Sequence, residues 1–179
     1  MYFTGDGNLS EQYIEFLKSR RSIRVFKDEE LDLDTILKIL DIARWAPSAR
    51  NAQPWEFIIV RNKETLKKLG ELSPATRPIL NAPAAIVVVT DPGVAPVTYQ
   101  VDGACVTMYI LLAVHALGLG GVWINALRYQ DEIRKLLKMP ESKVPIAIVA
   151  LGKPAEKPKP KPRKDVKEMT YLEYYGNKI

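Results

Sequence analysis

The chain has 179 residues, of which 47% are hydrophobic and 26% charged, and this balance is typical of one globular domain. Its net charge is +5, and residues 153–179 carry +4 of it, since eight Lys and Arg outnumber four Asp and Glu there. One cysteine and one histidine exclude an internal disulfide and a zinc site of the usual kind, and no apolar run is long enough to span a membrane. We therefore expect a single cytoplasmic domain over residues 1–179, with no metal site and no membrane contact.

Hydrophobic spacing predicts the elements in chain order. A first helix is capped by Ser10, and a second helix, capped by Asp32 or Asp34, ends before Pro47. Residues 46–55 are predicted to form a loop. Strands are predicted over 56–60, 84–90, 122–127 and 145–151, and helices over 63–72, 99–117 and 130–138. Residues 153–179 begin with a Pro- and Lys-rich stretch and are predicted to form an extended C-terminal arm. This order indicates an α+β domain with one central sheet.

The helix predicted over 99–117 is apolar nearly all round, so we expect it in a core or at a subunit interface. It contains His115, the one histidine. We interpret His115 as a buried core residue rather than as a catalytic base. Gly118 is predicted to stop the helix.

The first candidate site is the cluster RRSIR, which contains Arg20, Arg21, Ser22 and Arg24. Three guanidinium groups and a hydroxyl at the end of a helix supply the donors that suit a phosphate. The alternative is a solvated basic segment that complements the C-terminus of the helix.

The second candidate site is the segment PSARNAQPW, in which Ser48, Asn51 and Gln53 both donate and accept hydrogen bonds. The pyrimidine edge of a flavin alternates donors and acceptors, so such side chains suit it. The alternative is a capped loop that places Trp55 in the core.

Two further segments complete the set of candidates. The segment GLGGVWINA is followed by a strand rather than a helix, so the dinucleotide-binding fingerprint is absent and no dedicated nicotinamide domain is expected. The segment KPKPRK suits a phosphate or another anionic partner. It lacks the interleaved aromatic residues of a nucleic-acid platform, so we expect no nucleic acid as a partner.

Taken together, RRSIRVF, APSARNAQPWEF, a long apolar helix ending in GLGGVWI, and LGKP followed by KPR resemble the nitroreductase family over about residues 10–170. The resemblance implies a three-layer α+β fold, with a central, mostly antiparallel sheet flanked by helices. It also implies an intertwined homodimer, in which the C-terminal arm of each chain reaches the partner and two FMN molecules lie at the subunit interface.

The resemblance further implies a role for each candidate residue. By this resemblance, the phosphate end of FMN is bound by Arg20, Arg21, Ser22, Lys161 and Arg163, and Arg24 lies beside the N1–O2 edge of the flavin. The partner subunit contributes Pro47, Ser48 and Asn51, with Gln53 close by. The backbone of Ile124, Asn125 and Ala126 faces flavin N5.

The activity implied is transfer of hydride from NADH or NADPH through FMN to a small electron acceptor (a nitroaromatic, a quinone or a flavin) by a ping-pong mechanism. No catalytic acid or base is then required. Two departures from longer members stand out, since many have Glu-Gly where Asn125 and Ala126 stand, and a helical insertion has little room between Leu72 and Ala84. The alternatives are another flavin reaction, such as dehalogenation or dehydrogenation of a metabolite, and a protein that binds flavin without catalysis.

Overall fold

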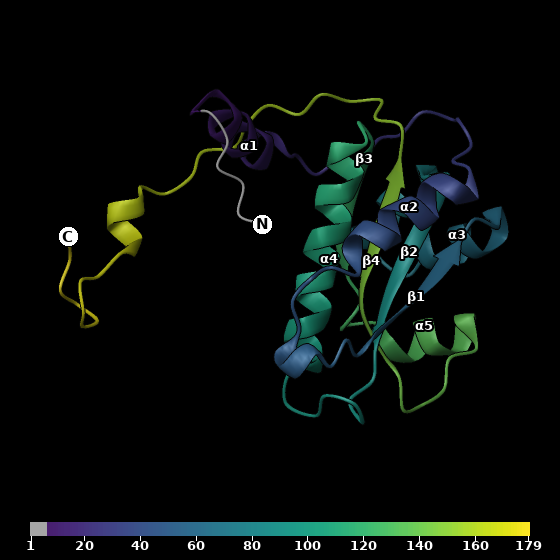
Figure 1. The fold of residues 1–179 in the computed structure, drawn as a ribbon. Coiled ribbons are helices and arrows are strands. Elements are labelled where there is room, and N and C mark those ends of the chain that lie inside the picture. Colours follow the sequence, from purple (N-terminus) through teal and green to yellow (C-terminus); the bar gives the residue numbers. More distant parts are fainter. Residues whose placement is uncertain (1–6) are drawn as a thin grey trace.

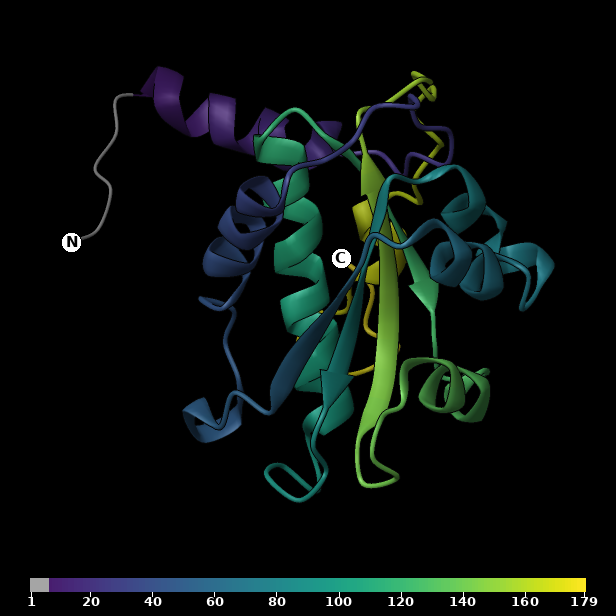
Figure 2. The same ribbon diagram turned by 90° about the vertical axis from the view of Figure 1, so that its right-hand side faces the viewer.

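The computed structural model describes residues 7–179 and has a four-stranded sheet between two layers of helices (Figures 1 and 2). The α-helices are α1 (Gly7–Ser19), α2 (Leu33–Ala43), α3 (Lys63–Gly70), α4 (Tyr99–Ala116) and α5 (Gln130–Leu137). The strands are β1 (Trp55–Val60), β2 (Ala84–Thr90), β3 (Gly120–Asn125) and β4 (Val144–Gly152). Short 3₁₀ helices are η1 (Ala49–Asn51), η2 (Pro74–Asn81) and η3 (Val166–Met169).

The sheet has the strand order β1-β2-β4-β3, and each pair of neighbours is antiparallel. This confirms the predicted α+β class and the mostly antiparallel central sheet. The inner strands β2 and β4 are buried along almost their whole length, because helices cover both faces of the sheet. The two edge strands, β1 and β3, are the ones that leave backbone groups free for other partners.

Two apolar cores hold the helices against the sheet. One face carries α2 and α4, with Ile36, Val106 and Ile110 fully buried against alternate residues of β2 and β4. The opposite face carries α3, η2 and α5 (Figure 2), where Leu69 and Ile133 are fully buried. The period-2 alternation of side chains along β2 divides its residues between the two cores.

Most element ends agree with the sequence-based expectations. The carboxylate of Asp32 accepts the N–H of Thr35 at 2.6 Å, which confirms it as the cap of α2. Helix α1 is already formed at Gly7, so the predicted cap at Ser10 is wrong and that residue lies inside the helix. Strand β3 begins at Gly120, two residues earlier than predicted, because it pairs there with the end of β4 at Gly152.

Helix η2 was not predicted, because its two prolines favour a loop. A 3₁₀ helix tolerates Pro74 at its first position, and a reciprocal pair of hydrogen bonds between Ser73 and Thr76 closes its N-terminal end. It occupies the short segment between Leu72 and Ala84 and packs against α3.

Helix α1 and the C-terminal arm extend beyond the body of the chain, and the arm runs past α1 before it ends (Figure 1). Both carry apolar side chains that one chain leaves exposed: Tyr13, Ile14, Leu17, Val166, Met169, Leu172, Tyr174 and Tyr175. Exposed apolar groups of this number are typical of an interaction surface. Among the helices in the described part of the chain, none combines the length and apolar character needed to cross a membrane.

Candidate functional site

The segment that follows α1 lies along the free edge of β3. The backbone N–H of Ile23 donates to the carbonyl oxygen of Gly121 at 3.1 Å, and Ser22 forms a parallel bridge with the same glycine. Ile23 is buried, whereas Arg24 is exposed. The RRSIR cluster therefore follows the edge of the sheet instead of projecting into solvent.

Two guanidinium groups act on a third, that of Arg20, at the start of this segment. Arg20 is half-buried, and its pKa is lowered first by burial and then by the positive charges of Arg21 and Arg163. The C-terminal arm thus returns close enough for Arg163 to act on Arg20. Within residues 7–179, none of the three forms an ion pair with a carboxylate. Cations held together without an ion-paired carboxylate are suited to a dianionic group such as a phosphate.

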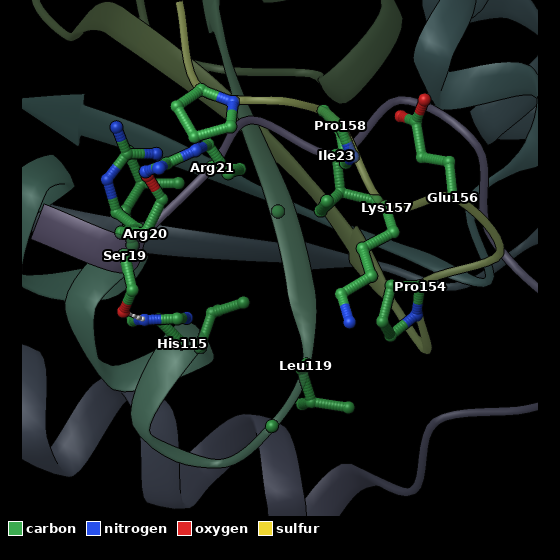
Figure 3. A pocket seen from close by; sticks show the side chains of 15 residues that line it. Ser19, Arg20, Arg21, Ile23, His115, Leu119, Pro154, Glu156, Lys157 and Pro158 are labelled. Carbon is green, nitrogen blue, oxygen red and sulfur yellow. Dashed lines mark hydrogen bonds between the residues drawn. The ribbon is translucent and has the colours of Figure 1, made fainter. Parts of the chain in front are cut away.

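A cavity of about 460 Å³ lies beside this cluster. Figure 3 shows Arg20 and Arg21 on one side of it, and Pro154 and Lys157 from the root of the arm on the other. The lining also includes Glu156 on the arm, and residues near the end of α4 and in the turn after it: Leu111, Val114, His115, Gly118 and Leu119.

His115 corrects the sequence-based expectation, because it is half-buried and lines this cavity instead of lying in the core. Its Nε2 lies 2.9 Å from the Oγ of Ser19, and its ring stacks on Phe16 with centroids 4.9 Å apart. The Ser19 hydroxyl also donates to the carbonyl oxygen of Phe16 at 3.0 Å. Burial lowers the pKa of His115, a hydrogen bond to the backbone of Phe16 partly opposes this, and the cations Arg20 and Arg21 lower the pKa further.

A second cavity, of about 350 Å³, runs along β3 from Val122 to Asn125, on the face of the sheet that carries η2 and α5, whereas α4 lines the first cavity. The lining of the second cavity contains Arg24 and the residues Ile124 and Asn125, so the structure brings together candidates that lie 100 residues apart. The first cavity touches β3 at Gly121 and the second reaches Asn125. Four residues of strand separate these positions, or about 13 Å.

The backbone of β3 decides which donors face outward. The N–H of Ala126 donates to the carbonyl oxygen of Ile146 at 3.2 Å, so it points into the sheet, and its side chain is buried. The carbonyl of Gly121 points outward, toward Ile23. Because hydrogen-bonding direction alternates along an antiparallel edge strand, the N–H of Asn125 also points outward. The side-chain Oδ1 of Asn125 accepts the N–H of Leu127 at 3.0 Å, so this oxygen is already bonded within the turn that follows β3.

The loop that contains Pro47, Ser48, Asn51 and Gln53 is held in an unusual conformation. Arg50, Asn51 and Gln53 have positive φ angles of 54°, 56° and 46°, respectively. Each such non-glycine residue costs roughly 1 kcal/mol. The Ser48 Oγ accepts the N–H of Gln53 at 3.0 Å, and the Gln53 amide donates to the carbonyl oxygen of Asn51 at 3.2 Å.

This loop lies far from the other candidates within one chain. It leads into β1, the edge strand opposite β3, and three strand spacings correspond to about 14 Å. It also lies at the N-terminal end of α4, where Asp102 accepts the N–H of Ala49, whereas His115 stands near the other end. Thirteen helical residues separate those two positions, or about 20 Å. One chain therefore does not bring the loop and the RRSIR cluster to one cavity.

Other site residues occupy simpler positions. Lys161 and Pro47 are exposed, and Lys161 lies on the arm between Pro160 and Arg163. Sequence reasoning missed Glu156, whose carboxylate accepts the backbone N–H groups of Arg24 and Val25 and so fastens the root of the arm to the RRSIR segment. It also missed Asp102, which the sequence marks as the one charged residue in an otherwise uncharged helix.

Comparisons with known proteins give one family. The model of the nitroreductase family matches residues 17–91 and 75–153. A "Putative NADH dehydrogenase/NAD(P)H nitroreductase" of Methanothermobacter thermautotrophicus is 41% identical over 159 residues, which cover 86% of this chain and 83% of that protein. A protein of the same name from Parabacteroides distasonis has a solved structure with a TM-score of 0.87 and 30% identity, covering 92% of this chain and 99% of that one.

More distant relatives have different names. An FMN reductase [NAD(P)H] of Bacillus subtilis is 28% identical over 187 residues, covering 93% of this chain and 75% of that protein. An iodotyrosine deiodinase of Thermotoga neapolitana is 29% identical over 177 residues, covering 85% of this chain and 94% of that protein.

Proposed function

Since the chain belongs to the nitroreductase family, we propose that it binds FMN along the edge of β3 and passes electrons from NADH or NADPH to a small acceptor in a ping-pong reaction. Its family and relatives make the protein an NAD(P)H-dependent flavin oxidoreductase with FMN as its cofactor. The observation that supports this position of FMN is the course of the RRSIR segment along the edge of β3, which places Arg20 beside the first cavity and Arg24 with Ile124 and Asn125.

The residues present fit FMN at both ends of this edge. Arg20, Arg21 and Arg163 form a cation cluster at one end, with no ion pair to a carboxylate in the described residues, and it matches a phosphate in charge and donor number. Ser22 and the exposed Lys161 belong to the same end in our proposal. Farther along the strand, between Val122 and Asn125, the smaller cavity offers Arg24 and the outward edge of β3 to a flavin ring.

When bound, FMN supplies the redox chemistry, accepting two electrons and a proton from the nicotinamide and passing them to the acceptor. The protein holds and polarises it. Arg24 would place a positive charge beside the N1–O2 edge, where negative charge develops on reduction. The outward N–H of Asn125 would donate to N5, with Ile124 and Ala126 fixing the strand behind it. No side chain needs to act as acid or base.

A complete site needs a second copy of the chain. We propose a homodimer in which the partner's loop, with Pro47, Ser48, Asn51 and Gln53, contacts the flavin bound along β3. The distance between this loop and the RRSIR cluster within one chain supports this arrangement, as do the exposed apolar side chains of α1 and the arm. In this dimer the arm, residues 153–179, would cover part of the partner while Arg163 stays with the phosphate.

The acceptor is proposed to be a small nitroaromatic, a quinone or a free flavin. The short segment between α3 and β2 supports an open site, since η2 alone fills the region where a larger cover would stand. The relative named iodotyrosine deiodinase supports a second candidate, reductive dehalogenation at the same flavin.

The first test is the visible spectrum of the purified protein, with anaerobic addition of NADH and then NADPH. We expect a yellow protein with one FMN per chain that bleaches with at least one donor and regains colour with a nitroaromatic or a quinone. Light scattering during gel filtration should give the mass of a dimer. Regain of colour with halotyrosine alone would favour dehalogenation, and a monomer without flavin that takes up no added FMN would refute the proposal.

A further inference from the structure

A buried carboxylate stands behind the strained loop of residues 47–53. Asp102 is 3% exposed, and within residues 7–179 it is the one charged side chain among the buried residues. It lies in the first turns of α4, where a negative charge is favourable next to the positive end of the helix dipole. A charge in this position is kept only where hydrogen bonds compensate for the lost water.

Both of its carboxylate oxygens are used, and they bond to two different segments. One oxygen accepts the backbone N–H of Ala49 at 3.1 Å, inside the loop. The other accepts the hydroxyl of Thr98 at 2.8 Å, at the start of α4. Asp102 therefore links the loop to the helix, and no other side chain outside the loop hydrogen-bonds to residues 47–53 in the described part of the chain.

The loop needs such a tie, because its conformation is unfavourable by itself. Arg50, Asn51 and Gln53 all have positive φ angles, which side chains other than glycine adopt rarely. A strained segment persists only where its surroundings hold it, and such segments occur where a binding surface is formed in advance. The bond to Ala49 lies directly before the first strained residue.

We infer that Asp102 is a positioning residue for FMN, and that it acts on the flavin bound to the other subunit. It holds Ser48, Asn51 and Gln53 in the geometry that receives the partner's flavin, so its own chain's RRSIR cluster does not benefit from it. This inference rests on the proposed function, because it uses the dimer and the flavin position proposed there.

Three variants test the role of Asp102 in positioning the loop. In D102A both hydrogen bonds are lost, and we expect the dissociation constant of FMN to rise at least tenfold. In D102N the amide oxygen still accepts from Ala49, so this conservative variant should recover much of the affinity. The matched control is T107V, which removes a buried hydroxyl of the same helix that bonds to Gly103 and not to the loop. It should lose thermal stability without losing FMN.

A dimer that combines two different variant chains tests whether Asp102 acts on the flavin site of its own chain or on that of the partner. Two tagged chains, one with R20A and one with D102A, are co-expressed, and the mixed dimer is isolated by both tags. If Asp102 serves the partner, both defects fall on one site and the other site is intact, so the mixed dimer holds one FMN with the affinity of the wild type. If Asp102 serves its own chain, each site carries one defect and no tight site remains.

The outcomes separate this inference from the proposed function. A wild-type protein that takes up no FMN contradicts the proposed function itself. A wild type that binds FMN while D102A behaves like T107V refutes the role of Asp102. A mixed dimer without a tight site, when both homodimers are defective, refutes its action across the interface.

Discussion

A Cβ atom on Gly120 would lie 2.8 Å from the Cβ of Ile23, a distance that such atoms essentially never show. The first residue of β3 must therefore be glycine for the RRSIR segment to lie against the edge of the sheet. The contact joins two parts of the chain that would hold the phosphate and the ring of one cofactor.

The first prediction concerns this contact. In G120A the new methyl group pushes Ile23 away, and we expect a loss of roughly 1–3 kcal/mol in unfolding free energy together with weaker FMN binding. The control is G118N, because Gly118 has a φ of 70° and open space around it, and Asn accepts that conformation. Urea denaturation and FMN titration of both variants check the prediction, and equal behaviour would contradict it.

The second prediction concerns the phosphate end. R20A and R163A should each weaken FMN binding by on the order of 1.5–3 kcal/mol, since each removes a charge-assisted hydrogen bond. Fluorescence titration with FMN measures the effect. The control is K68A, which removes an exposed cation paired with Glu64 on α3 and should leave the titration unchanged. If R20A and R163A both keep the affinity of the wild type, the phosphate lies elsewhere.

A third prediction follows from the charge of Arg24. R24M should lower the reduction potential of bound FMN by on the order of 20–40 mV, because 1 kcal/mol of lost stabilisation of the reduced form equals about 20 mV for two electrons. R24K retains the charge and should recover most of the potential. Anaerobic titration against a reference dye provides the measurement. An unchanged potential in R24M would show that this side chain does not lie near the flavin ring.

Backbone direction along β3 gives a fourth prediction. N125P removes the outward N–H, and a proline is tolerated on an edge strand whose N–H faces away from its neighbour. We expect a lower potential and slower reduction by NAD(P)H in N125P. N125A keeps the N–H and loses only the bond from Leu127, so it should resemble the wild type in stopped-flow reduction. Slow reduction in both variants would assign the effect to the side chain.

The fifth prediction is a dependence on pH through His115. Its pKa is lowered from 6.5 in the folded chain, chiefly by burial, so the unfolded chain binds the proton more readily. The stability that His115 contributes is therefore full above about pH 6.5 and is lost as the pH falls through the lowered folded value. Because the side chain of H115Q remains neutral, the wild type should lose more unfolding free energy than H115Q between pH 7.5 and pH 5. A constant difference between the two proteins would contradict this assignment.

Local patterns in the sequence were sufficient for most elements of the fold. The apolar run of β2, the cap at Asp32 and the proline after α2 act through neighbouring residues, so their effect can be read without the tertiary structure. Helix η2 was missed because its prolines have two local interpretations. The early start of β3 was missed because a glycine pair has no strand propensity and is fixed by its partner strand.

The sequence by itself determined the family and supplied the residue types of the candidate site, since the RRSIR and PSARNAQPW segments carry charge and hydrogen-bonding groups whose chemistry does not depend on their positions. Only the tertiary structure decided how these groups are arranged. The antiparallel order of the sheet puts RRSIR along β3 and the loop beside β1, on opposite edges. The same packing moves His115 from the expected core to a cavity wall, and it places the Asp102 carboxylate behind a strained loop. Such relationships join residues that are distant in sequence, so no local pattern contains them.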